Sequence, residues 1–306
     1  MTRFKRSRWS IPAIAAVAVA ILVAACGGST PGTTSKGTLT VGGFNFPESD
    51  ILAQLYGQGL AHAGFDVKYK LDLGTRAVVV PAIQSGQIDL YPGYAASELE
   101  YLNKGKGEAT PDATATTAKL NTYLSALGAQ ALTPSAAFDG NAYAVTKATA
   151  AKYSLTKLSD LKPVASQLVF GAGPECKTYK YCLPGLTSVY GLHFKNTLTL
   201  DTDGPATRAA FKNGTIQVGL VFSTDADLDQ LGLVVLQDDM HMIAADNVVP
   251  VIRTPKATDD VKNLLDKIDA GLTTTDLFAM NGKVSLQHQD ADVVAKAYLV
   301  AHNYFA

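Results

Sequence analysis

Aromatic residues stand near the ends of expected strands in two separate parts of the chain. Tyr94 closely follows the strand expected at 88–91, and Phe222 ends the strand expected at 218–222. Tyr143 lies where the chain is expected to pass from one part to the other. A quaternary ammonium cannot donate a hydrogen bond but is attracted to ring faces, by about 0.5–2 kcal/mol for each desolvated ring. We therefore interpret these three rings as a candidate cation cage; the alternative is that each is a core residue.

Small hydroxyl side chains follow the same two strand ends. Ser97 comes three residues after Tyr94, and Ser223 and Thr224 follow Phe222 directly. In open α/β sheets, ligands bind beyond the carboxyl ends of the strands. We therefore expect these residues to face a cleft between two lobes.

The elements that would position these residues alternate between short strands and helices. In the first part, strands and helices are expected in turn at 39–42, 47–63, 67–71, 75–84 and 88–91. In the second part, the same alternation is expected at 169–172, 186–190, 197–200, 207–213 and 218–222. Three helices are expected to follow at 259–272, 273–280 and 290–302. This order predicts the α/β class, with each lobe a mostly parallel sheet flanked by helices.

The N-terminal segment has the pattern of a secretory leader. Four basic residues fall within the first eight, and an apolar run follows from 11 to 25 that is too short to span a bilayer. We predict a signal peptide at 1–25. The small residues before Cys26 resemble the lipobox of bacterial lipoproteins, which implies cleavage before Cys26 and a lipid anchor on its thiol. The alternative is an ordinary signal peptide with a chance cysteine.

The composition of the mature chain narrows its class. Residues 26–37 are rich in Gly, Ser and Thr and predict a flexible tether. Removing residues 1–25 takes away four of the 26 basic and none of the 27 acidic residues, which leaves a net charge of −5. That balance does not favour a nucleic-acid partner. No nucleophile elbow, phosphate loop or HExxH motif is present, so we expect neither an enzyme nor a cofactor or metal.

The other two cysteines, Cys176 and Cys182, are six residues apart. In an oxidising compartment, such an isolated pair predicts a disulfide that closes a short loop. A metal site or a redox pair is less favoured, because the spacing is not C-x-x-C and no histidine lies close by.

Several motifs, in order along the chain, carry a family resemblance. They include VGGFNFPES at 41–49, LGTR at 73–76, GQIDLYPGY at 86–94, GNAYAV at 140–145 and FSTD at 222–225. Together they resemble the glycine betaine, carnitine and choline binding proteins of ABC importers. The resemblance implies a two-lobed class II periplasmic-binding-protein fold that closes around its ligand.

The resemblance also implies the lobe boundaries. Lobe I is expected at 38–142 plus 249–306, and lobe II at 143–248. The hinge is expected near 140–143 and 246–250, and the C-terminal helices are expected to return to lobe I.

The resemblance assigns roles residue by residue. Tyr94, Tyr143 and Phe222 match three tyrosines of the family's cage, and Ser97 matches a residue that faces the ligand. A fourth tyrosine is lost near Ala245. The other expected site residues are Asn45, Phe46 and Ser49, which match the family's opening motif, together with Thr224 and with Tyr179, which falls where some members have an arginine for the ligand carboxylate.

These departures leave the ligand open. A betaine carboxylate could instead meet backbone N–H groups at the helix start after Pro47, or the ligand has no carboxylate. Arg76 could line the cleft or form an ion pair between the lobes. We expect a monomeric, lipid-anchored, extracytoplasmic solute-binding component that passes a quaternary-ammonium osmoprotectant to ABC permease subunits. The alternatives are a non-cationic solute such as a polyol, a sugar-like or an aromatic compound, and, in another class, an envelope enzyme or a sensory ectodomain.

Overall fold

The computed structural model describes residues 35–201 and 203–305. The expected signal peptide at 1–25, Cys26 and most of the expected tether lie outside the described residues. Within the described part of the chain, every helix is too short or too polar to traverse a bilayer.

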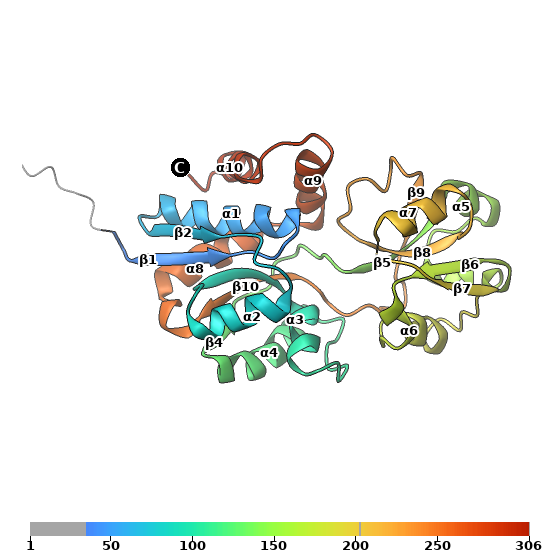
Figure 1. Ribbon diagram of the computed structural model, residues 1–306, viewed down its shortest axis with the longest axis horizontal. Helices are drawn as coiled ribbons and strands as arrows, with labels where there is room; N and C mark the ends of the chain where they lie inside the picture. The colour runs from blue at the N-terminus through green and yellow to red at the C-terminus, as the bar shows by residue number, and fades with distance from the viewer. Residues whose placement is uncertain (1–34, 202, 306) are drawn as a thin grey trace, which may run out of the picture. The chain divides into compact units, whose positions relative to one another are not determined.

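Five strands form the first sheet, in the order β2-β1-β3-β10-β4 (Figure 1). Their bounds are β1 (Thr38–Gly42), β2 (Asp66–Lys70), β3 (Leu90–Tyr94), β4 (Ala129–Ala131) and β10 (Val248–Arg253). Strand β1 runs parallel to β2 and β3, whereas β10 runs antiparallel to both β3 and β4. Four strands therefore run one way and β10 runs the other.

The second sheet repeats this plan in the order β7-β6-β8-β5-β9. Its strands are β5 (Asn141–Thr146), β6 (Val169–Ala172), β7 (Asn196–Thr199), β8 (Val218–Phe222) and β9 (Leu233–Leu236). Here β5 is the reversed strand, antiparallel to β8 and β9. The two-lobed α/β fold with mostly parallel sheets is thus confirmed. In each sheet, the antiparallel strand is the first strand that the chain forms after it crosses from the other lobe.

The two passages between the lobes lie side by side. The backbone N–H of Asp139 donates to the carbonyl of Asp246 at 3.2 Å, and Phe138 pairs with Asn247. Asn141 already pairs within the second sheet and Val248 within the first. The chain therefore enters the second sheet two residues before the expected start of lobe II at 143. It returns to the first sheet one residue before the expected position 249.

Most helices cover the first sheet. They are α1 (Pro47–His62), α2 (Arg76–Ser85), α3 (Ala95–Leu102), α4 (Ala113–Leu124), α8 (Asp259–Gly271), α9 (Thr274–Ser285) and α10 (Ala291–Ala301). Proline suits the first turn of α1, because amide hydrogens there have no partner within the helix. Glu48 suits it because the helix dipole is positive at the N-terminus. Helices α8, α9 and α10 all contact α1.

The second lobe has three shorter helices, α5 (Lys147–Tyr153), α6 (Leu183–Ser188) and α7 (Pro205–Lys212). The predicted disulfide between Cys176 and Cys182 is present just before α6. It closes the loop that carries Tyr179.

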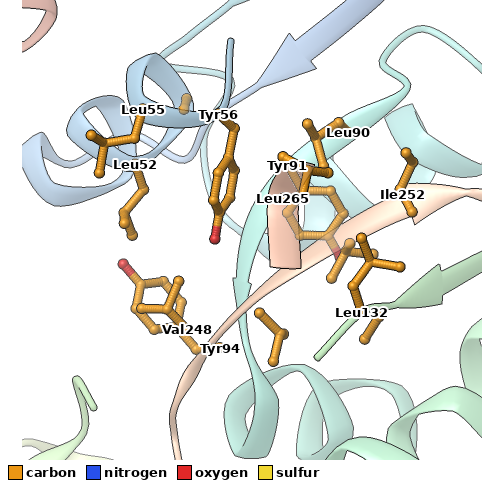
Figure 2. Packing of buried hydrophobic residues seen from close by; sticks show 14 of the residues in the cluster. Leu52, Leu55, Tyr56, Leu90, Tyr91, Tyr94, Leu132, Val248, Ile252 and Leu265 are labelled. Atoms are coloured by element: carbon orange, nitrogen blue, oxygen red, sulfur yellow. The ribbon is translucent and has the colours of Figure 1, made fainter. Parts of the chain in front are cut away.

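Each lobe has its own hydrophobic core. In lobe I, leucines and Tyr56 from α1 face Leu90 and Tyr91 of β3 across one continuous cluster (Figure 2). In lobe II the sheet separates two clusters, because side chains alternate between its faces. Tyr143 and Val145 of β5 lie in one cluster and Ala144 in the other.

Candidate ligand-binding site

A pocket of about 490 Å³ is lined by residues from both lobes and from both passages between them. Tyr94 at the end of β3 and Phe222 at the end of β8 both line it, together with Phe46, which precedes α1. The two strand ends face the same pocket, as expected for open α/β sheets.

Three aromatic rings therefore share this pocket. The rings of Phe46 and Tyr94 have centroids 6.1 Å apart. Phe222 is 38% exposed, and its backbone N–H donates to Asp203 Oδ2 at 2.8 Å, which fixes the start of the loop after β8. Tyr94 is buried beside its strand partner Val248 (Figure 2). Two partly exposed rings and one buried ring are thus available to a ligand.

Tyr143 is placed elsewhere than its expected position in the cage. It is 1% exposed, its hydroxyl donates to the carbonyl of Tyr181 at 2.7 Å, and its ring centroid is 6.1 Å from that of Phe170. It does not line this pocket, whereas Asn141, two residues earlier on the same face of β5, does. Among the expected aromatic residues, Phe46, Tyr94 and Phe222 therefore line this pocket and Tyr143 does not.

The remaining expected site residues divide into two groups. Ser97 and Thr224 line the pocket. Ser97 donates from both its backbone N–H and its hydroxyl to the carboxylate of Asp246, at 2.8 and 2.5 Å. Ser49 is buried, and its hydroxyl accepts from the backbone N–H of Phe44 at 2.8 Å. Ser49 thus stabilises the turn before α1 instead of reaching a ligand.

Asn45 and Tyr179 also lie outside this pocket. Asn45 is exposed. Tyr179 lines a second pocket of about 400 Å³, which also includes the two disulfide cysteines. The disulfide loop also contacts lobe I: Lys180 Nζ of this loop donates to the carbonyl of Gly107 at 2.9 Å. The position that carries an arginine in some family members therefore faces a neighbouring pocket.

The main feature that sequence reasoning missed is a set of acidic side chains. Five carboxyl groups line the ligand pocket, against two guanidinium groups. The acids are Glu48, Asp139, Asp203, Asp225 and Asp246, and the bases are Arg76 and Arg208. Among the described residues, no group of three or more His, Cys, Asp or Glu side chains is arranged to hold a metal ion. An excess of negative charge in a concave site attracts a cation.

Burial and mutual repulsion change the protonation of these acids. Burial raises the pKa of Asp203 to about 7, although the backbone N–H of Phe222 opposes the shift. Burial, followed by the charge of Glu48, raises the pKa of Asp139 well above its ordinary value. Burial also raises the pKa of Asp246, against the opposing effect of Arg76. The pocket therefore holds carboxyl groups that a bound cation would help to ionise.

Arg76 forms its ion pair within lobe I and not between the lobes. Its Nε donates to Glu98 Oε1 at 3.0 Å, and Glu98 is fully buried. Its guanidinium also lies 5.2 Å from the ring centroid of Phe44. Both partners belong to lobe I, so this ion pair does not join the lobes. Arg76 lines the ligand pocket while its charge is largely balanced within its own lobe.

Comparisons with known proteins agree with this geometry. Residues 37–301 match the family model described as the substrate binding domain of the ABC-type glycine betaine transport system. The chain is 28% identical over 294 residues to the glycine-betaine-binding protein of Pseudomonas aeruginosa, covering 92% of this chain and 94% of that protein. It is 25% identical over 290 residues to the carnitine transport binding protein OpuCC of Listeria monocytogenes, covering 90% of each.

The solved structure of apo YehZ from Escherichia coli superposes with a TM-score of 0.72 at 25% identity, covering 87% of this chain and 99% of that chain. Because the family match spans nearly the whole described chain, the family does not depend on any single relative. The chain belongs to the family of substrate-binding domains of ABC-type glycine betaine transport systems, and it is a solute-binding protein, not an enzyme.

Proposed function

We propose that this protein binds a quaternary-ammonium solute in the pocket lined by Phe46, Tyr94 and Phe222. The observation that carries the proposal is that three rings and an excess of carboxyl groups line one pocket between the lobes. Ring faces attract a cation that has no hydrogen to donate. The carboxyl groups supply a negative field in a site partly withdrawn from water.

The charge balance disfavours the alternative of a neutral solute. A polyol or a sugar would not favour the ionised forms of Asp139 and Asp246, whose pKa values burial raises. A cation reduces the repulsion among these groups when it binds. The same balance makes a ligand carboxylate unfavourable unless it lies against Arg76 or Arg208.

Binding is coupled to lobe closure in this proposal. Asp139 and Asp246 lie in the two passages between the lobes and also line the pocket. A ligand favours the closed state only to the extent that it binds that state better. The closed form is then the one that docks on the permease subunits of the importer.

Membrane attachment completes the proposed function. Cys26 follows an apolar leader and precedes a tether rich in Gly, Ser and Thr. A diacylated cysteine at this position holds the mature protein at the extracytoplasmic face of the membrane. Mass spectrometry of the membrane-extracted protein tests this step: a diacyl-modified N-terminal Cys26 supports the anchor, and an unmodified mature N-terminus contradicts it.

A ligand panel tests the binding proposal directly. Isothermal titration calorimetry compares tetramethylammonium, choline, carnitine and glycine betaine with sorbitol, trehalose and sodium benzoate. We expect saturable binding of trimethylammonium compounds and none of the neutral or anionic solutes. Binding of only the latter compounds would overturn the proposal.

A further inference from the structure

Tyr181 lies between strands β6 and β7 of lobe II but packs within the core of lobe I. It stands in the loop that Cys176 and Cys182 close just before α6. Tyr181 is 4% exposed and joins the hydrophobic cluster of lobe I, whereas Cys182, the next residue, joins a cluster of lobe II. The boundary between the two cores therefore falls within the disulfide loop.

Two hydrogen bonds also fasten this loop to lobe I. The hydroxyl of Tyr181 donates to the carbonyl of Ala109, and Lys180 Nζ donates to the carbonyl of Gly107 at 2.9 Å. Burial, followed by the charge of Glu100, raises the pKa of Tyr181 to about 12, so at neutral pH the hydroxyl keeps the hydrogen that it donates. The loop thus has both an apolar and a polar attachment to lobe I.

The segment of lobe I that accepts these bonds is itself held in place. Glu100 of α3 is buried, and its carboxylate accepts from the backbone N–H of Gly107 at 2.7 Å and from that of Ala109 at 2.8 Å. Hydrogen bonds to an ionised carboxylate are among the strong ones. The two residues whose carbonyls receive the loop are therefore fixed by lobe I alone.

Lobe II holds the same loop from the other side. The hydroxyl of Tyr143 on β5 donates to the carbonyl of Tyr181 at 2.7 Å, and the disulfide closes the loop around Tyr181. A continuous series of contacts therefore runs from β5 of lobe II through Tyr181 to Ala109 of lobe I. This contact accounts for the buried position of Tyr143 away from the ligand pocket.

We propose that Tyr181 is a latch between the lobes, which holds them in the observed arrangement without a ligand, and that Tyr143 and the disulfide position it. The latch is an attachment in addition to the two passages of the chain. The second pocket is lined both by the disulfide loop and by Asn141 and Asp246 of the passages, so the latch and the passages enclose it. The inference does not depend on which solute the protein binds.

The latch affects how tightly any solute binds. Phe46 and Tyr94 of lobe I and Phe222 of lobe II line one pocket in the latched arrangement. The apparent affinity of a protein is its intrinsic affinity reduced by the fraction of molecules that are in the binding arrangement. A latch that keeps this fraction high in the free protein therefore strengthens binding without touching the ligand.

Pulsed dipolar EPR tests the latch in the ligand-free mature chain, with Cys26 replaced by serine so that it takes no label. Spin labels at Thr122→Cys of α4 and Lys152→Cys of α5 occupy exposed positions, one in each lobe and both outside the disulfide loop. We expect one narrow distance distribution in this parent and a broader one, extending to longer distances, in Tyr181→Ala. A broad distribution in the parent, or an unchanged one in folded Tyr181→Ala, would overturn the latch.

Milder variants separate the latch from general stability. Lys180→Ala combined with Tyr181→Phe keeps the buried ring and removes both hydrogen bonds to lobe I, and this double variant decides the question should Tyr181→Ala fail to fold. Tyr190→Phe is the matched control, because Tyr190 is 3% exposed and its hydroxyl donates to Asp238 within lobe II. We expect a broader distribution in the double variant and the parent distribution in the control. Equal broadening in both would overturn the latch, since the loss of any buried tyrosine hydroxyl would then loosen the protein.

Two further variants test the positioning of Tyr181. We expect Tyr143→Phe and the pair Cys176→Ser with Cys182→Ser each to broaden the distribution less than Tyr181→Ala does, and to add nothing in combination with it. The parent distribution in both would remove Tyr143 and the disulfide from the latch.

Calorimetry with choline then tests the effect on binding. We expect the Kd of the double variant Lys180→Ala with Tyr181→Phe to rise about threefold or more, because fewer free molecules are in the binding arrangement. An unchanged Kd beside a broadened distribution would overturn this effect on affinity. Absence of choline binding in the parent would count against the proposed function and not against the latch, because the distance measurement contains no ligand.

Discussion

Replacing Phe222 by alanine tests the cation pocket with little risk to the fold. The side chain is 38% exposed at the end of β8, so its truncation lowers the unfolding free energy by only about 1–2 kcal/mol. One ring facing a cation contributes about 0.5–2 kcal/mol. Since 1.4 kcal/mol corresponds to a tenfold change in affinity, we expect the Kd for choline to rise about 2- to 30-fold.

Two further variants separate the ring's electrostatics from its apolar surface. Phe222→Leu keeps most of the apolar contact but has no ring face, so we expect it to lose nearly as much affinity as the alanine variant. Phe278→Ala is the matched control: Phe278 is 37% exposed but does not line the ligand pocket. We expect wild-type affinity for this control, with a similar loss of stability.

Calorimetry gives the affinity and urea denaturation gives the stability of each variant. The reasoning is refuted if Phe222→Ala binds choline as tightly as the wild type while remaining folded. It is also refuted if Phe222→Leu fully restores affinity, because apolar contact and not the ring face would then hold the ligand.

Three other perturbations test separate parts of the structure. Tyr94→Phe keeps the ring but removes the donor to buried Glu48, so we expect urea denaturation to show a loss of about 1–3 kcal/mol, with the affinity for choline changed less than threefold. Burial raises the pKa of Asp203 to about 7, so between pH 4 and 7 the folded protein holds a proton that the unfolded chain has released. Wild-type stability relative to Asp203→Asn should therefore fall as the pH rises through this window, in denaturation series at several pH values. Replacing Cys176 and Cys182 by serine removes a short loop closure, and we expect the unfolding free energy to fall by about 2 kcal/mol in urea denaturation.

Each of these expectations has a contrary result. A large affinity loss in Tyr94→Phe would show that the hydroxyl, and not the ring, matters to the ligand. The raised pKa would be contradicted if wild-type stability relative to Asp203→Asn increased from pH 4 to pH 7. Full stability of the double serine variant would mean that the disulfide loop is held by its other contacts.

Local sequence patterns predicted the elements whose ends depend on neighbouring residues. The strands at 169–172 and 218–222 were predicted with their observed bounds. The helix expected at 75–84 runs over Arg76–Ser85, and Gly86 ends it at φ 76°, a conformation that glycine reaches without strain. Such signals depend only on neighbouring residues.

Strand β3 shows why other bounds were missed. It was expected at 88–91 but runs over Leu90–Tyr94 and includes Pro92. Proline cannot donate to a neighbouring strand, which argues against a strand interior. Here Pro92 stands opposite Pro250 of β10, and because neither can donate, the pair must occupy a non-hydrogen-bonded position of the antiparallel ladder. That pairing joins residues far apart in the sequence and could not be predicted from either one alone.

The site itself was predicted where it depends on strand ends and missed where it depends on how the lobes are joined. Tyr143 was expected in the cage, but it lies two residues beyond Asn141 on the same face of β5, about 7 Å further into lobe II. Asp139 and Asp246 converge because the two passages between the lobes pair with each other. Burial and the charge of Glu48 raise the pKa of Asp139, so a cation bound in the pocket would favour the ionised form of an acid that the paired passages place there.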